Sequence, residues 1–171
     1  MDVLREGGIQ AFITSQGVMD GPANEPVRKW LMDNTSLVSA VRLPNNLFFE
    51  HAGTEVGSDM IILQKNTDKT SLTSEKQVFL KSRNLSNGEK INNYFQNFQR
   101  VVHTKGYMGT DPYGKPAMIF VHEGAIPGIA SDLKKMLTDD FSKRLDTQLY
   151  LNNMLATPKP QFQMPKPTEQ D

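Results

Sequence analysis

The chain has 171 residues, of which 37% are hydrophobic and 22% are charged. This composition is typical of a globular protein and excludes a disordered one, and the length suits one domain with a core and an appendage. The 19 Lys and Arg residues balance 19 Asp and Glu residues, so the net charge is zero. DNA-binding modules that act alone usually carry a basic surplus, so strong unaided binding of nucleic acid is not expected.

The sequence contains no cysteine. This excludes disulfides and cysteine metal sites, and it suits a reducing cytoplasm. No apolar run approaches the roughly 20 residues that span a bilayer. The N-terminus MDVLREGG has none of the basic, apolar and small regions of a signal peptide. We therefore expect a cytoplasmic protein with no membrane partner.

The first third of the chain alternates between helix and strand signals. Residues 1–8 predict the last turn of a helix, because the pair Gly7-Gly8 is a stop signal, and so short a helix is expected to have begun upstream. Residues 9–17, IQAFITSQG, form an apolar run typical of a strand buried on both faces. After the loop MDGPA, Asn24 can cap a helix. Its predicted apolar stripe comprises Val27, Trp30 and Leu31.

Two further strands complete this part of the chain. Residues 36–43 are rich in apolar side chains up to Pro44, and residues 59–65, DMIILQK, predict the next strand. The short connection between these strands favours a third strand that runs back antiparallel. Residues 1–66 therefore predict an α/β order of helix end, strand, helix, strand, loop and strand.

Residues 67–152 predict an accessory α+β segment. A capping box at Ser74 and Gln77 opens a helix that ends at about residue 83. Residues 91–98 follow helical spacing.

A hairpin and two helices are predicted next. The runs RVVHT (100–104) and AMIFVHE (117–123) flank a turn-rich stretch, which indicates a hairpin with a long loop. Two amphipathic helices follow from Pro127, with Thr138 as the cap between them. Residues 153–171 are rich in proline with little to bury, and they predict a disordered tail.

Residues 1 to about 66 carry a family resemblance. The ordered strings REGGIQAFITSQG, VRKWLMDN, VRLPNNLF and DMIILQK resemble the C-terminal half of the catalytic domain of adenine-specific (amino) DNA methyltransferases. The likeness is to the modification subunits of type I restriction systems and to the large methyltransferase–helicase fusions of mobile elements. In that family a glycine pair leads into the fifth strand of the sheet that binds S-adenosylmethionine. The sixth strand ends in Leu-Pro-x-x-x-Phe, matched here by Leu43, Pro44 and Phe48, and the seventh is antiparallel and ends in Lys.

The resemblance implies a partial Rossmann-like methyltransferase sheet, made of its last three strands with one antiparallel, and an α+β extension. The implied division of the chain is a methyltransferase part over residues 1–66, an accessory segment over 67–152, and the tail over 153–171.

The resemblance also assigns target-base and DNA contacts. Methylation of adenine requires extrusion of the base from the duplex, and in relatives an aromatic residue just before the seventh strand stacks on it. That position maps to Phe48, with Phe49 as the alternative. The competing interpretation is that both phenylalanines cover the end of the sheet by packing. Asn45 and Asn46 are candidates for the DNA backbone, although a turn role is favoured because Asn tolerates the left-handed conformation.

Two further family motifs are not in the sequence. One is the Phe-x-Gly-x-Gly turn that lets the backbone approach the cofactor, and the other is the (Asn/Asp)-Pro-Pro-(Tyr/Phe) loop that accepts hydrogen bonds from the adenine amino group. The nearest string, Asp111-Pro112-Tyr113-Gly114, lacks one proline and follows the predicted strands, so it predicts a type I turn. His103, His122 and Glu123 make a thin case for a metal site, because solvent-facing strand positions explain them as well. No catalytic, cofactor-binding or metal-binding residue is therefore expected in this chain.

The implied function is part of an S-adenosylmethionine-dependent, adenine-specific DNA methyltransferase. The chain would contribute sheet strands and part of the target-base and DNA face, and it is expected to be inactive alone. Its expected partners are the missing N-terminal methyltransferase half, which would bind the cofactor, and DNA through the intact enzyme. The alternative is a stand-alone, non-catalytic remnant that binds DNA or a protein, and a third interpretation is an unrelated small α/β domain.

Overall fold

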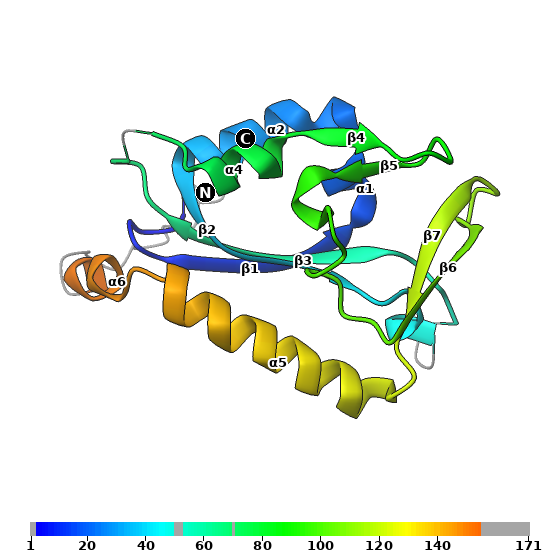
Figure 1. Cartoon of the computed structure of the whole chain (residues 1–171). Coiled ribbons are helices and arrows are strands. Elements are labelled where there is room, and N and C mark those ends of the chain that lie inside the picture. Colours follow the sequence, from blue (N-terminus) through cyan, green and yellow to red (C-terminus); the bar gives the residue numbers. More distant parts are fainter. Residues whose placement is uncertain (1–2, 50–52, 70, 155–171) are drawn as a thin grey trace, which may run out of the picture.

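The computed structural model describes residues 3–49, 53–69 and 71–154, and Figure 1 shows their arrangement. The predicted disordered tail therefore lies almost wholly outside the described residues. The elements are β1 (Ile9–Ser15), α1 (Gln16–Asp20), η1 (Pro22–Asn24), α2 (Glu25–Asn34), β2 (Thr35–Leu43), η2 (Asn45–Phe48), β3 (Ser58–Lys65), α4 (Ser74–Leu80), β4 (Ser82–Asn84), β5 (Lys90–Asn92), η3 (Asn93–Phe95), β6 (Lys105–Thr110), β7 (Pro116–Val121), α5 (Ala125–Arg144) and α6 (Thr147–Met154).

The main sheet has the strand order β1-β3-β2. Strand β3 pairs antiparallel with both neighbours, so that Met60 lies opposite Ile13 on one side and Val41 on the other. The predicted antiparallel direction of the third strand is confirmed. Because both neighbours run opposite to β3, strands β1 and β2 run in the same direction and end at the same edge of the sheet.

Strands β2 and β3 are buried because helices cover both of their faces (Figure 1). On one face α5 packs through Ile129, with Val41 and Val102 beneath it. Its Asp140 is buried and accepts a 2.6 Å hydrogen bond from the Ser39 hydroxyl. The other face carries α2, α4 and the small β4–β5 sheet, as Figure 1 shows.

The larger core cluster lies on the face with α2 and α4. It comprises Met19, Met32, Leu37, Ala40, Ile61, Leu63, Phe79, Ile91, Tyr94, Phe95, Val101 and Phe120. One core therefore joins residues from both sides of position 66. The boundary between a methyltransferase part (1–66) and an accessory segment (67–152) stays a prediction. It does not coincide with a boundary between two hydrophobic cores.

Strand β1 is an edge strand, and its predicted burial on both faces is wrong. Ile9, Ala11 and Ile13 are exposed, and the exposed fraction of Ile13 is 51%. Only β3 pairs with β1 among the described residues. The apolar run predicted the strand correctly, but it could not show how many neighbours the strand has.

Two predictions near the N-terminus also need correction. Residues 3–8 form turns rather than a helix end, and Gly7 has a φ of 72°. The amide of Gly7 donates to the Lys65 carbonyl at 2.9 Å, so this segment extends the sheet instead. The strand predicted over residues 9–17 ends at Ser15, and the short helices α1 and η1 take the place of its last two residues and of the predicted loop MDGPA.

Of the stripe predicted for helix α2, only Leu31 packs against the larger core cluster. Asn24 is at its N-cap position, but its side chain donates to the Gly17 carbonyl and caps no helix amide. Val27 and Trp30 are exposed, whereas Arg28 and Met32 are buried. The prediction failed because it counted only apolar residues, and a buried arginine was not considered.

The accessory segment keeps its predicted α+β character but differs in detail. Helix α4 has its N-cap at Thr73 and ends at Leu80, and residues 90–95 form β5 and η3 rather than a helix. The hairpin strands are β6 and β7, so the loop between them is short.

Residues 100–102 lie beside the main sheet instead of forming the first hairpin strand. The amide of Arg42 donates to the Arg100 carbonyl at 2.8 Å, and the amide of Val102 donates to the Arg42 carbonyl at 2.9 Å. Helix α5 runs unbroken past Thr138 to Arg144. Within the described ranges, no helix has the length and apolar character needed to cross a membrane.

Candidate functional site

The carboxyl ends of β1 and β2 form one edge of the sheet, and three segments gather there. Helix α1 follows β1 directly, η2 follows β2 after Pro44, and the β6–β7 hairpin lies at the same side of the molecule (Figure 1). In open α/β sheets, ligands bind beyond the carboxyl ends of the parallel strands. This edge is therefore where a site is expected.

The two asparagines of η2 hold the hairpin in place. The Oδ1 atom of Asn45 accepts from the Phe120 amide at 3.0 Å. The Oδ1 atom of Asn46 accepts from the His122 amide at 3.0 Å, while its Nδ2 donates to the His122 carbonyl at 3.1 Å. Asn45 is buried and Asn46 half-buried. Contact of these side chains with the DNA backbone stays a prediction, and their amide groups already bind β7.

The outer edge of β7 is capped along its length by side-chain oxygens. Besides the bonds at Phe120 and His122, the amide of Met118 donates to Glu89 Oε2 at 2.8 Å. These amides alternate along the strand and point away from β6, so they would otherwise lack a partner. The hairpin is thus fixed to η2 and to the β4–β5 turn by hydrogen bonds rather than by a continuous sheet.

We expect Asn45→Ala to lower the free energy of unfolding by about 1–3 kcal/mol, because the buried Phe120 amide loses its acceptor. Urea denaturation would measure the loss, and faster hydrogen exchange at the Phe120 amide would locate it. The matched control is Asn84→Ala, an exposed position on β4, with an expected change within about 0.5 kcal/mol. Unchanged stability and exchange in Asn45→Ala would contradict this role.

The two phenylalanines after the asparagines differ in exposure. Phe48 ends η2 and is half-buried, whereas the next residue, Phe49, is 55% exposed. Leu47 between Asn46 and Phe48 packs against the cluster under α5. The loop is therefore anchored by Leu47 and by the asparagines, and it presents aromatic surface at the sheet edge.

A buried charged triad lies behind this edge, and sequence reasoning missed it. Arg42 Nε donates to Asp59 Oδ1 at 2.8 Å, Nη2 donates to Asp59 Oδ2 at 3.0 Å, and Nη2 also donates to Asp20 Oδ1 at 2.9 Å. The guanidinium also lies over the Phe95 ring, 4.3 Å from its centroid. All three charged residues are buried, so the group is held by pairing rather than by water. A lone arginine in an apolar strand was the signal that could have led to it.

The pKa values of the triad follow from burial and pairing. Burial alone lowers the pKa of Arg42, but coulombic attraction and hydrogen bonds from Asp59 and Asp20 outweigh it, so the pKa of Arg42 is raised. Burial raises the pKa of Asp59, and Arg42 opposes that effect. Two carboxyl groups share one guanidinium, so Arg42 is the cation that both depend on.

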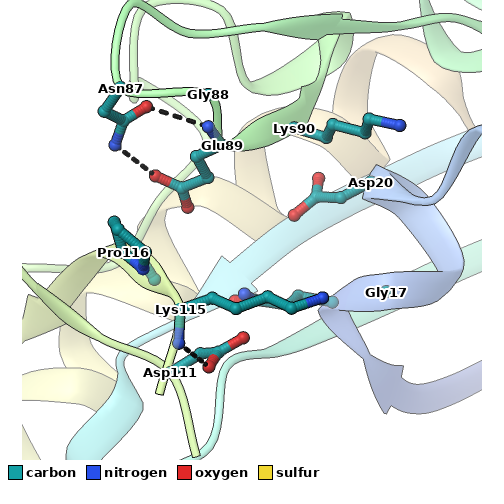
Figure 2. A pocket seen from close by; sticks show the side chains of 11 residues that line it. Gly17, Asp20, Asn87, Gly88, Glu89, Lys90, Asp111, Lys115 and Pro116 are labelled. Atoms are coloured by element: carbon teal, nitrogen blue, oxygen red, sulfur yellow. Dashed lines mark hydrogen bonds between the residues drawn. The ribbon is translucent and has the colours of Figure 1, made fainter. Parts of the chain in front are cut away.

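Asp20 also lines a cavity, shown in Figure 2. The cavity has a volume of about 450 Å³ and lies between α1, the β4–β5 turn and the tip of the hairpin. Its lining residues are Gln16, Gly17, Asp20, Asn87, Gly88, Glu89, Lys90, Asp111, Lys115, Pro116 and Ala117.

The string at residues 111–114 forms a turn, as predicted. The amide of Gly114 donates to the Asp111 carbonyl at 3.0 Å, and Gly114 has a φ of 78°. The carboxylate of Asp111 accepts from the amides of Tyr113 and Lys115 at 2.9 and 2.8 Å. This carboxylate stabilises the turn of the hairpin.

The histidines are not on paired, solvent-facing strand positions. His122 is buried, and its Nδ1 accepts from the Gly124 amide at 3.0 Å while its Nε2 lies 3.1 Å from Asp132 Oδ2. The hydrogen bond from His122, with another from Lys135, lowers the pKa of Asp132. His103 precedes β6 and packs edge-on against Phe120. Over the described part of the chain, no group of three or more His, Asp or Glu residues could hold a metal ion.

Comparison with known proteins identifies the family. No curated protein matches the chain. The solved structure of the type I restriction enzyme EcoKI M protein is similar over 90% of this chain and 42% of that chain, with 14% sequence identity and a TM-score of 0.35. This chain thus spans less than half the length of that M protein. The sequence model of the N-6 DNA methylase family matches residues 1–116. Since this is more than half of the sequence, the chain belongs to the N-6 DNA methylase family.

Proposed function

We propose that the chain is the C-terminal part of an S-adenosylmethionine-dependent, adenine-specific DNA methyltransferase. In this proposal β1, β2 and β3 are the last three strands of a Rossmann-like sheet, and residues 67–152 form an accessory segment that acts with them. The family match supports the reaction class. The cytoplasm is the proposed site of action.

The cofactor and the catalytic motif are assigned to a missing N-terminal half. No residue of this chain is assigned to S-adenosylmethionine, because neither the Phe-x-Gly-x-Gly turn nor the (Asn/Asp)-Pro-Pro-(Tyr/Phe) loop occurs in its sequence. The chain by itself is therefore expected to bind no S-adenosylmethionine and to transfer no methyl group to DNA. Turnover by the purified chain would contradict this assignment.

The open edge of β1 is the observation that supports a missing half. An edge strand with exposed apolar side chains is prone to pair with another strand, and β1 exposes Ile9 and Ile13. A neighbouring strand and a covering helix from an N-terminal half would bury both residues. That arrangement would also restore the burial that the apolar sequence of β1 predicts.

We expect the chain alone to self-associate through this edge, and Ile13→Lys to shift it toward the monomer. A lysine on an edge strand opposes strand pairing because its charge must stay in water. Sedimentation velocity across a concentration series would measure the shift. Val78→Lys on α4, where Val78 is 40% exposed, is the matched control and should leave association unchanged. A monomeric parent, or equal effects of both variants, would favour a self-sufficient fold instead.

We propose that Phe48 stacks on the extruded adenine, with Phe49 as the alternative. Stacking on a base contributes about 1–3 kcal/mol, so Phe48→Ala in the intact enzyme should weaken binding of a duplex with an unpaired target adenine by about 5- to 150-fold. Fluorescence anisotropy would measure the affinity. The same loss in Phe49→Ala alone would transfer the role to Phe49.

A matched control separates stacking from a general aromatic effect. Trp30 is exposed on α2, outside η2, so Trp30→Ala should leave DNA affinity unchanged. Asn45 and Asn46 are proposed to hold η2 against the hairpin, and their variants should alter stability more than they alter base contact. Unchanged affinity and turnover in both Phe48→Ala and Phe49→Ala would exclude a stacking role for this loop.

The alternative function is a stand-alone, non-catalytic remnant that binds DNA or a protein. Sequencing the coding DNA upstream of Met1 separates it from the favoured proposal. An open frame that carries both missing motifs would make the chain part of a methyltransferase. An in-frame stop directly upstream, with a ribosome-binding site before Met1, would support the remnant.

A further inference from the structure

Two lysine side chains lie together near the amino end of β2 without an acidic partner. Lys76 of α4 is only 8% exposed, and its ammonium group interacts directly with that of the half-buried Lys69. Lys69 donates to the neutral carbonyls of Met32 and Thr35 at the end of α2. Over the described part of the chain, neither lysine forms an ion pair.

The two ammonium groups repel each other, because burial leaves little water to screen their charges. Burial and the neighbouring Lys76 lower the pKa of Lys69 to about 8, and burial also lowers the pKa of Lys76. An anion held beside both groups would remove this repulsion.

The polar groups around Lys76 include more donors than acceptors. The hydroxyl oxygen of Ser36 accepts from Asn66 Nδ2 at 3.1 Å and from Lys76 Nζ at 3.3 Å. The hydroxyl hydrogen of Ser36 is therefore left to donate, and no described residue accepts it. Because an ammonium group has three donors and no acceptor, this cluster lacks a ligand that only accepts.

A small cavity opens beside these groups. Its volume is about 210 Å³, and its lining residues are Ser36, Leu37, Thr73, Glu75, Lys76 and Arg144. This volume lies below the roughly 300–1,000 Å³ of sites for drug-sized molecules. The cavity therefore suits a small anion.

The carboxylates near the cavity already have cations. Glu75 in the cavity wall pairs with Arg144 at 2.5 Å. Asp140, the second carboxylate beside Arg144, also pairs with Arg100. Asp33, which acts on Lys69 from a distance, pairs at 2.6 Å with a lysine of its own helix α2. The positive charge of the two clustered lysines thus stays without a counterion among the described residues.

This cavity is far from the edge that carries η2. Ser36 and Leu37 lie near the start of β2, whereas η2 follows its carboxyl end. From Ser36 to Leu43 the strand rises roughly 23 Å, since each residue adds about 3.3 Å. The cavity therefore belongs to a different part of the molecule from the proposed base-stacking loop.

We propose that this cavity binds a phosphate group, as the free ion or as a small monoester. The phosphate oxygens accept from Lys76 Nζ and from the Ser36 hydroxyl, and Lys69 contributes its charge from beside them. A phosphate monoester carries a charge of about −1.5 to −2 near pH 7, which balances the two lysines. The site goes beyond the proposed methyl transfer, because it requires neither the cofactor, the missing half nor DNA.

Thermal unfolding of the full chain in sodium phosphate and in sodium chloride, at equal ionic strength and pH 7, tests the site. A ligand that binds only the folded chain stabilises it, so the Tm should rise by about 3–5 °C for each tenfold increase in phosphate above the Kd. An equal Tm in the two salts would overturn the proposal.

Variants show whether the stabilisation comes from this cavity. Lys76→Met should abolish the rise in Tm with phosphate, and Ser36→Ala should weaken phosphate binding several-fold. In chloride, Lys76→Met should be at least as stable as the parent, because it removes a buried charge that has no counterion. Lys81→Met is the matched control, since Lys81 is exposed, directly follows α4 and pairs with Glu25. An equal response to phosphate in Lys76→Met and Lys81→Met would overturn the assigned contacts.

Titrations followed by ¹H–¹⁵N NMR distinguish the sources of the phosphate. Inorganic phosphate and O-phosphoserine should shift the amides of Ser36, Leu37 and Lys76, and the tighter of the two assigns the site to the free ion or to a monoester. Shifts at these amides with a DNA duplex, but with neither small anion, would overturn the proposal. Methyl transfer enters none of these measurements, so a failure here is distinct from a failure of the proposed function.

Discussion

Arg42→Ala is expected to lower the free energy of unfolding by about 3–5 kcal/mol, because it leaves Asp20 and Asp59 buried without their cation. Asp59 is fully buried, so water cannot replace the guanidinium beside it. The contact with the Phe95 ring is lost as well. Domains of this size have a free energy of unfolding of about 5–15 kcal/mol. The variant should therefore lose a large part of it. Urea denaturation followed by circular dichroism would measure the change.

Two comparisons show whether the loss comes from the unpaired carboxylates. Arg83→Ala removes a partly exposed arginine whose guanidinium donates to the Gln96 carbonyl at 3.2 Å, and it should cost less than about 1 kcal/mol. Adding Asp59→Asn to Arg42→Ala should recover part of the stability, because one buried charge is removed. A loss below about 1 kcal/mol in Arg42→Ala, or no recovery in the double variant, would contradict the triad as described.

The direction in which the stability of Arg42→Ala changes with pH is an independent test of the triad. Burial already raises the pKa of Asp59 above its ordinary value while Arg42 opposes the shift, and removing Arg42 leaves only the raising effect. A carboxyl with a raised pKa binds more protons in the folded state than in the unfolded state, so stability increases as the pH falls through that pKa toward the ordinary value of an unfolded Asp. Stability of Arg42→Ala should therefore rise as the pH is lowered below 7. A fall over the same range would count against an unpaired Asp59.

The strands of the main sheet were predictable because their signals are local. Residues 36–43 and 59–65 are apolar runs bounded by Pro44 and polar loops, and burial of β2 and β3 on both faces produces such runs. The antiparallel return followed from the short connection alone. The burial of β1 was not predictable, because an apolar run is the same whether or not a neighbouring strand is present.

The contacts of the candidate site depend on residues far apart in the chain. Asn45 and Asn46 suit a turn by their type, and their actual partners, Phe120 in β7 and His122 just after it, lie 75 and 76 positions later. Hydrophobic periodicity in the sequence does not predict a hydrogen bond between residues so far apart. The position of Phe48 and Phe49 at the end of β2 was predictable, because they follow Leu43 and Pro44 within a few residues in the sequence.

Of the two buried arginines, only Arg42 could have been recognised from the sequence, and a search for apolar patterns overlooks it. Arg42 interrupts an apolar strand, and Asp59 opens the next one, so their pairing could have been inferred from the cost of burying either charge alone. Arg28 gave no such signal, because it lies among polar residues on a helix that has two exposed apolar side chains. Its environment is visible only in the folded chain.

Arg28→Ala is expected to lower the free energy of unfolding by about 3–5 kcal/mol. Its guanidinium is fully buried and donates to the carbonyls of Leu80, Val18 and Gly21 at distances of 2.8–3.0 Å. Burial lowers the pKa of Arg28, and nearby acidic groups only partly oppose this. The side chain thereby joins α1, α2 and the end of α4, and its removal takes the guanidinium donors from all three carbonyls, of which Gly21 keeps the Asn24 amide.

Arg28→Lys and Lys29→Ala separate geometry from charge and helix propensity. Lysine keeps the charge but presents one ammonium in place of the planar fork, so it cannot reach all three carbonyls, and Arg28→Lys should still lose more than about 2 kcal/mol. Lys29 is the next residue of the same helix and makes an exposed ion pair with Asp33, so Lys29→Ala should cost at most about 0.5 kcal/mol. Near-parent stability of Arg28→Lys would mean that charge alone suffices. In that case the planar guanidinium of Arg28 would not be what joins α1, α2 and α4. A positive charge near the carboxyl ends of α1 and α4 would be enough.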